Sequence, residues 1–247
     1  MRKNKFWKFI VFGVFVLLIF SAINYLTYER QPLPQASAAL KSDDTVKVTR
    51  EPWLEFTPTS SAPSTGFIFY SGGRISYLGY SDLMRAIAEK GYLVVVPKMP
   101  LNMAIFDSNI AVEIIAAHPG IAHWVIAGHS VGGTAAALYT SMNPNKIDGL
   151  AIWSSYPAEN SNLSKLNIPL VILYGGNETG VTDESVGARK HLLPPNTKYI
   201  KIKGGDHHQF GSYELTTEEN LATVSREEQH AIILEEMFEL LQSVDGR

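Results

Sequence analysis

The hydrophobic pattern divides the chain into an apolar N-terminal stretch and a longer body in which short apolar runs alternate with amphipathic segments. Short apolar runs rich in β-branched residues are typical of strands that are buried on both faces. The segments between them repeat apolar residues at the spacing of a helix. Strands are therefore predicted at 67–70, 92–96, 124–127, 149–153, 170–174 and 198–202, and helices at 77–90, 110–117, 134–142, 184–192 and 226–241.

This alternation predicts βαβ units, and hence a mostly parallel central sheet with helices on both faces, which is the α/β fold class. The loosely alternating stretch 45–56 precedes these units and predicts one or two edge strands, interrupted at Pro52. In sheets of this kind the functional loops follow the carboxyl ends of the strands. Candidate chemistry is therefore expected just after the apolar runs.

The N-terminal stretch from Phe9 to Tyr28 contains no charged residue. A helix of this length spans about 30 Å, the thickness of the hydrocarbon core of a bilayer. Four basic residues before it predict a cytoplasmic N-terminus; they are Arg2, Lys3, Lys5 and Lys8. Residues 1–28 are therefore predicted to be a single-pass transmembrane signal-anchor at the cell membrane, with the body outside the cytoplasm.

A cleaved signal peptide and a secreted protein are the alternative, because Ala36-Ser37-Ala38 resembles a cleavage site. That site lies beyond Glu29, Arg30 and two prolines, whereas cleavage normally follows the apolar core closely. Residues 29–45 are predicted to be a linker, since prolines interrupt pairing and Ser and Ala dominate afterwards. The globular domain is expected to cover residues 46–247.

Composition narrows the function of this domain. Apolar residues make up 45% of the chain and charged residues 18%, which is ordinary for a folded protein. The formal net charge is only −3, and no basic stripe suggests nucleic acid as a partner. The chain has no cysteine, which excludes disulfides, thiolate metal sites and a cysteine nucleophile.

The segment Gly128-His129-Ser130-Val131-Gly132 fits the pattern G-x-S-x-G. It follows the predicted strand 124–127 and precedes the predicted helix 134–142, which is the setting that a nucleophile elbow requires. The glycines permit a sharp turn, and the serine oxygen then lies at a helix N-terminus that favours an anionic transition state. Ser130 is the predicted nucleophile; a glycine-rich turn without chemistry is the alternative.

A serine hydroxyl is a poor nucleophile until a base takes its proton. Among the seven histidines, His207 and His208 follow the predicted strand 198–202, in a loop where the base should lie. His129 lies inside the elbow and is expected to pack beneath Ser130.

A third group must orient the histidine and stabilise its charged form. In chain order it should lie between the serine and the histidine. Glu178, in the loop after strand 170–174, is the predicted acid, and Asp183 is the alternative. Asp206 is adjacent to His207, which makes a productive bond awkward. The alternative for both Glu178 and Asp183 is an ordinary solvated loop carboxylate.

The site also needs two donors for an oxyanion. The backbone N–H of Val131, the residue after the nucleophile, is the first predicted donor. The loop Ser71-Gly72-Gly73-Arg74 follows an early strand and should supply the second, from Gly73 or Arg74. An ordinary turn is the alternative for this loop.

Five ordered motifs resemble a bacterial group of small α/β-hydrolases, of the fold-5 type and distantly similar to dienelactone hydrolase. The motifs are Phe69-Tyr70-Ser71-Gly72-Gly73, residues 96–104, Gly128-His129-Ser130-Val131-Gly132-Gly133, Ser155-Tyr156-Pro157 and residues 204–211. The resemblance covers about residues 60–242. It implies an α/β-hydrolase fold with little or no cap domain, and His207 rather than His208 as the base.

Two departures from this group limit what the resemblance carries over. The group usually has aspartate where this chain has Glu178, so the acid loop should lie slightly further back. Dienelactone hydrolases use a cysteine nucleophile, and this chain has none, so their substrate is not carried over.

The sequence thus predicts a serine hydrolase of the carboxylesterase type. Ser130, His207 and Glu178 would cleave a small-molecule ester through an acyl-enzyme, a mechanism that requires no metal or organic cofactor. Two alternatives remain, which are an acyltransferase that uses the same residues and a catalytically inactive, membrane-tethered binding protein of the same fold.

Overall fold

Eight strands form one sheet in the order β1-β2-β4-β3-β5-β6-β7-β8 in the computed structural model, which describes residues 3–245. The strands are β1 (Val46–Thr49), β2 (Leu54–Pro58), β3 (Thr65–Tyr70), β4 (Leu93–Val96), β5 (His123–His129), β6 (Gly149–Trp153), β7 (Leu170–Gly175) and β8 (Lys198–Ile202). β1 and β2 pair antiparallel at one edge, and every pairing from β4 to β8 is parallel. The predicted mostly parallel sheet, with two edge strands before it, is confirmed.

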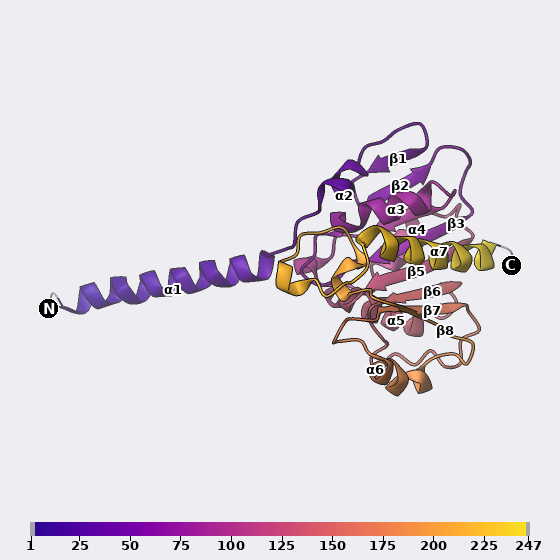
Figure 1. Ribbon diagram of the computed structural model, residues 1–247. Helices are drawn as coiled ribbons and strands as arrows, with labels where there is room; N and C mark the ends of the chain where they lie inside the picture. The colour runs from indigo at the N-terminus through magenta and orange to yellow at the C-terminus, as the bar shows by residue number, and fades with distance from the viewer. Residues whose placement is uncertain (1–2, 246–247) are drawn as a thin grey trace.

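Helices cover both faces of this sheet (Figure 1). The helices are α1 (Lys3–Thr27), α2 (Pro34–Ala38), α3 (Ser81–Ala88), α4 (Ala111–Ala117), α5 (Val131–Met142), α6 (Asp183–Ala188) and α7 (Arg226–Asp245). Short 3-10 helices are η1 (Tyr77–Tyr80), η2 (Pro100–Asn102), η3 (Ala104–Phe106), η4 (Lys190–Leu192), η5 (His207–Phe210) and η6 (Thr217–Glu219).

Alternate side chains along the strands feed two separate cores. Phe67 and Phe69 point to the core under α3 and α7, whereas Ile68 points to the core under α4 and α5. Because both faces are covered, the parallel strands are apolar on both sides, and this produced the continuous apolar runs in the sequence. The arrangement gathers the loops after β3, β5, β6, β7 and β8 at one edge of the sheet.

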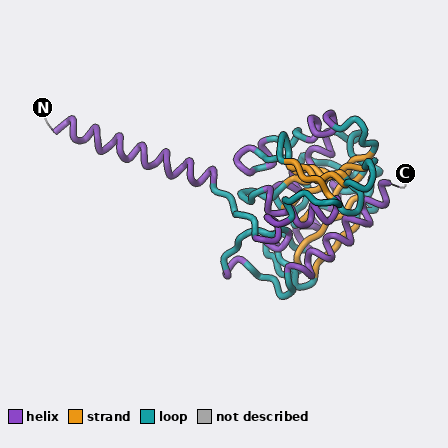
Figure 2. Tube along the Cα trace, turned by 90° about the horizontal axis from the view of Figure 1, so that it is seen from above, coloured by secondary structure: helices purple, strands orange, loops and turns teal. Residues whose placement is uncertain are grey.

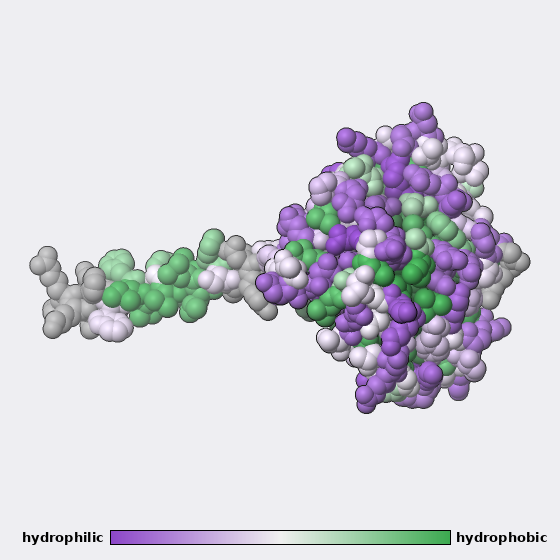
Figure 3. Space-filling view, viewed as in Figure 1, coloured by the Kyte–Doolittle hydropathy of each residue, from purple (hydrophilic) through white to green (hydrophobic). Residues whose placement is uncertain are grey.

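Helix α1 extends away from the body in both views (Figures 1 and 2), and its described part carries exposed apolar side chains (Figure 3). None of the helices that the structure describes combines the length and the hydropathy that a bilayer-spanning segment needs. The predicted span 9–28 also includes residues 22–26, whose side chains lie outside the described ones. The predicted transmembrane anchor is therefore not supported by the described helices.

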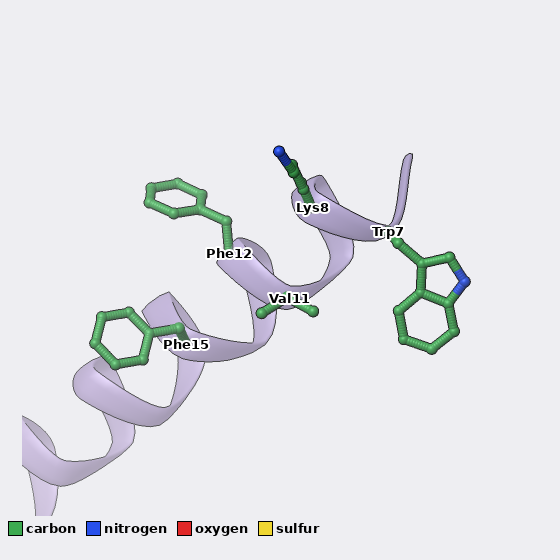
Figure 4. A pocket seen from close by; sticks show the side chains of 5 residues that line it. All are labelled: Trp7, Lys8, Val11, Phe12 and Phe15. Atoms are coloured by element: carbon green, nitrogen blue, oxygen red, sulfur yellow. The ribbon is translucent and has the colours of Figure 1, made fainter. Parts of the chain in front are cut away.

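A depression of about 540 Å³ lies along α1. Its lining residues are Trp7, Lys8, Val11, Phe12 and Phe15 (Figure 4). All five come from the outside of one helix, and none comes from the body. The depression is therefore not part of the site that the loops of the sheet form.

The predicted linker at residues 29–45 needs correction, because much of it packs on the body. Arg30 N–H donates to the Arg74 carbonyl and Leu33 N–H to the Ser212 carbonyl, both at 2.9 Å. Pro34 begins α2, since proline is well suited to the first turn of a helix, where its missing N–H has no partner to lose. The folded body therefore begins well before residue 46.

Candidate active site

The turn between β5 and α5 has the geometry of a nucleophile elbow. Ser130 has a φ of 54° and is the single residue between the end of β5 and the first residue of α5. A Cβ added to Gly128 would lie 2.3 Å from the Gly132 carbonyl oxygen, and one added to Gly132 would lie 2.2 Å from the Tyr70 carbonyl oxygen. Only glycine fits at these two positions, so the turn depends on the motif.

Ser130 and His207 line one cavity of about 220 Å³ at the carboxyl edge of the sheet. The other lining residues are Tyr28, Arg30, Gly73, Arg74, Ile75 and His208. His207 belongs to η5 and its side chain is 28% exposed, which leaves it accessible from the cavity. Within residues 3–245 no direct hydrogen bond joins Ser130 to His207; such bonds are often long without substrate and tighten when it binds.

Glu178 contacts the Nδ1 side of the His207 ring. Its Oε2 is 3.0 Å from His207 Nδ1, and its side chain is only 1% exposed. The Gly175 N–H donates to the other carboxylate oxygen. The loop after β7 thus presents a buried, oriented carboxylate to His207.

Ser154 is a further member of this group that the sequence analysis did not identify. Its hydroxyl donates to Glu178 Oε2, and its oxygen lies 2.5 Å from His207 Nδ1. Because the single hydroxyl hydrogen goes to the carboxylate, the oxygen can only accept, and His207 must carry a hydrogen on Nδ1. In the neutral imidazole, Nε2 then carries no hydrogen and can accept one. In the sequence, only the position of Ser154 pointed to such a role, since it directly follows β6 at the carboxyl end of that strand.

The alternative acid, Asp183, is engaged elsewhere. Its carboxylate oxygens bind Lys201 Nζ at 2.7 Å and the Tyr174 hydroxyl at 2.6 Å. These bonds, the one from Lys201 first, hold the pKa of Asp183 below its usual value. Asp206 is buried and accepts from the Leu221 N–H at 3.3 Å. Glu178 is therefore the carboxylate that the fold brings to His207.

In the loop after β3, the two candidate donors Gly73 and Arg74 differ in whether their backbone N–H is already engaged. The Arg74 N–H donates to the Asn102 carbonyl at 2.9 Å, so it has no hydrogen left for an oxyanion. The N–H groups of Gly73 and Val131 have no acceptor within residues 3–245. A Cβ on Gly73 would lie 3.1 Å from Val131 Cγ1, so these two residues are neighbours. The candidate donors are thus Gly73 and Val131.

His129 packs beneath the elbow, as expected, and joins three active-site loops. Its Nε2 lies 3.0 Å from the His207 carbonyl oxygen and its Nδ1 lies 2.8 Å from Tyr80 Oη. A carbonyl only accepts, so Nε2 carries the hydrogen and Nδ1 accepts from Tyr80. Tyr80 in turn accepts from the Gly72 N–H at 3.1 Å. Burial lowers the pKa of His129 well below its usual value and keeps it neutral, as this network requires.

Within the described chain, residues 3–245, no group of three or more His, Cys, Asp or Glu side chains is arranged to hold a metal ion. The fold instead brings three polar side chains together from the loops after β5, β7 and β8, namely Ser130, Glu178 and His207.

Several solved structures resemble this one. They include MGS-MChE2, an alpha/beta hydrolase from the metagenome of lagoon sediments of Mar Chica, Morocco, with 19% identity, a TM-score of 0.57, and coverage of 79% of this chain and 99% of that one. Est1E from Butyrivibrio proteoclasticus, solved with bound ferulic acid, has 13% identity, a TM-score of 0.57, and coverage of 79% and 98%. The esterase domain of a Rhodothermus marinus protein has 12% identity, a TM-score of 0.55, and coverage of 78% and 94%.

At identities this low, the structural likeness shows a shared fold alone. No curated protein matches the chain. The family model described as the alpha/beta hydrolase family matches residues 66–231, which is more than half of the chain and includes Ser130, Glu178 and His207. By this match, this chain belongs to the alpha/beta hydrolase family.

Proposed function

We propose that this chain hydrolyses a carboxylic ester through an acyl-enzyme on Ser130. The observation that carries the proposal is the connection from Glu178 to His207, at 3.0 Å, beside a cavity that His207 and Ser130 share. A buried carboxylate that orients an imidazole toward a serine is the arrangement that activates a hydroxyl for attack on a carbonyl carbon.

In the proposed reaction, His207 Nε2 takes the proton of Ser130 as the serine oxygen attacks the ester carbonyl. The N–H groups of Val131 and Gly73 donate to the oxyanion that forms. His207 then gives its proton to the leaving alkoxide, and an alcohol departs. A water molecule, deprotonated by the same nitrogen, then attacks the acyl-enzyme. His207 gives this proton to the departing serine oxygen, which releases the acid and restores the Ser130 hydroxyl and the neutral imidazole.

The comparisons support an ester as the substrate class. Esterases are among the structures that share the fold, and one of them was solved with bound ferulic acid. A series of nitrophenyl esters of increasing acyl length, hydrolysed by the full chain, tests the proposal. Hydrolysis that is absent for every ester, or equal in Ser130→Ala, would refute it.

Replacing Glu178 by alanine is expected to lower kcat by about 10³- to 10⁴-fold, because His207 then loses the group that orients it and stabilises its charged form. Asp183→Ala is the matched control, since Asp183 binds Lys201 and Tyr174 instead. It should keep kcat within about twofold of the wild type. Steady-state kinetics on one nitrophenyl ester measures both; a larger loss in Asp183→Ala would assign the acid to Asp183.

Ser154→Ala should lower kcat by about 10- to 100-fold, the effect of one charge-assisted hydrogen bond. The hydroxyl donates to the Glu178 carboxylate and accepts from His207 Nδ1. Without it, the side chains of Glu178 and His207 are held less firmly in their orientation. KM should change little, because Ser154 is buried and does not line the cavity. An unchanged kcat would show that the Glu178–His207 contact alone orients the base.

We also propose that residues 9–28 attach the chain to a membrane, with the catalytic body outside the cytoplasm. The uncharged run in the sequence and the exposed apolar side chains of α1 support this, because such a helix is stable in an apolar medium. The full chain should then stay with the membrane fraction in alkaline carbonate. Release into the supernatant at full length would contradict the attachment.

A further inference from the structure

The segment that follows α1 forms one wall of the catalytic cavity. We name residues 28–33 the strap. Tyr28 and Arg30 line the same cavity as Ser130 and His207, although about 100 residues or more separate them along the chain. The strap is therefore placed where a bound ester would meet it.

The backbone of the strap pairs with the loop that carries a predicted oxyanion donor. The Arg30 N–H donates to the Arg74 carbonyl at 2.9 Å, and the Ser76 N–H donates to the Arg30 carbonyl at 3.0 Å. Arg30 and Ile75 thus form a parallel β-bridge, two residues after Gly73. This pairing fixes the loop from one side, and the bond from the Arg74 N–H to the Asn102 carbonyl fixes it from the other.

The strap also binds the loop that follows His207. The Glu214 N–H donates to the Gln31 carbonyl at 2.9 Å. The Arg30 guanidinium binds both carboxylate oxygens of Glu219, with Nη1 at 2.8 Å from Oε2. The hydrogen bond from Arg30 lowers the pKa of Glu219 to about 2, so the pair stays charged at neutral pH.

We propose that the strap completes the active site. Arg30 acts as a positioning residue that fixes the Gly73 loop and, through Glu219, the loop after His207, while Tyr28 is the wall that contacts the ester. This inference rests on the proposed ester hydrolysis. It implies that cleavage at Ala36-Ser37-Ala38 would remove part of the active site, so the active protein keeps the strap.

Kinetics of full-chain variants on a nitrophenyl ester tests the positioning role. Arg30→Met and Glu219→Gln should each lower kcat/KM by about tenfold, mainly through kcat. Arg85→Met is the matched control, because Arg85 binds Asp43 and the Lys41 carbonyl and so ties down the same N-terminal region outside the cavity. It should keep the wild-type kcat. Equal losses of kcat in Arg30→Met and Arg85→Met would contradict the proposal, because they would show that the strap only attaches the N-terminal region and does not position the two loops.

Tyr28→Ala tests the wall. It should raise KM by about three- to tenfold and change kcat less, because a contact made equally in the bound ester and the transition state affects binding. Tyr28→Phe keeps the ring and should restore the wild-type KM. A KM that Tyr28→Ala leaves unchanged would remove Tyr28 from the proposal.

Hydrogen exchange separates this inference from the proposed function, because it needs no activity. In Arg30→Met the amides of residues 72–76 and 212–219 should exchange faster than in the wild type, while in Arg85→Met they should not. If exchange in Arg30→Met matches the wild type, the strap inference is wrong, even for an active enzyme. If exchange rises but the wild type hydrolyses no ester, the positioning holds and the proposed function fails.

Discussion

His207→Ala is expected to lower kcat for ester hydrolysis by about 10⁴- to 10⁶-fold, which is the loss seen when a serine hydrolase is left without its base. The imidazole of His207 is held at Nδ1 by Ser154 and Glu178, and it lines the cavity beside Ser130. With alanine, no group in this position can take the serine proton. Single-turnover and steady-state kinetics on a nitrophenyl ester measure the effect.

His208→Ala is the matched control for this prediction. His208 is adjacent in the chain and lines the same cavity, but it makes no contact with Glu178. Its variant should keep kcat within about tenfold of the wild type. If His208→Ala were the inactive variant and His207→Ala the active one, the assignment of the base would be reversed.

Gly132→Ala should produce the largest loss of stability among the variants considered. The added Cβ would lie 2.2 Å from the Tyr70 carbonyl oxygen and 2.5 Å from that of Ser71. Both are backbone atoms of the central sheet and its loop, so the elbow must move. We expect a loss of about 3 kcal/mol or more in the free energy of unfolding, together with activity.

Gly187→Ala is the matched control for Gly132→Ala, because it also lies in a helix but its Cβ would meet nothing within 4 Å. It should leave activity unchanged and stabilise by about 0.5–1 kcal/mol through helix propensity. Urea unfolding of the two variants gives the comparison. A Gly132→Ala protein with wild-type stability and activity would show that the tight packing of the elbow is not required.

Periodicity predicted the sheet and its helices because burial on both faces leaves a direct imprint on the strands. The run around Ile126 is apolar throughout since β5 lies between two helical layers. The position of Ser130 followed for the same reason, because a strand, a glycine turn and a helix occur in the order that an elbow requires. The local sequence pattern was therefore sufficient to predict the strands, the helices and the elbow.

Features that depend on tertiary contacts were beyond the sequence. The sequence allowed the Arg74 N–H as an oxyanion donor, but in the fold this N–H donates to the Asn102 carbonyl. In the sequence, Ser154 cannot be told from any other loop serine. Its contacts with Glu178 and His207 arise only because three loops meet in the fold. Residues 29–33 of the strap were predicted to belong to a linker, because their partners, residues 74–76 and 212–219, are distant in the chain.

The most direct test of the proposed mechanism is to label the full chain with a fluorophosphonate and locate the adduct by peptide mass spectrometry. This reagent forms a bond with a serine oxygen only where a base and oxyanion donors activate it. We expect one adduct on the peptide that contains Ser130 in the wild type, and none in Ser130→Ala or after unfolding. Labelling of another serine, or of both proteins equally, would contradict a nucleophile at the β5–α5 turn.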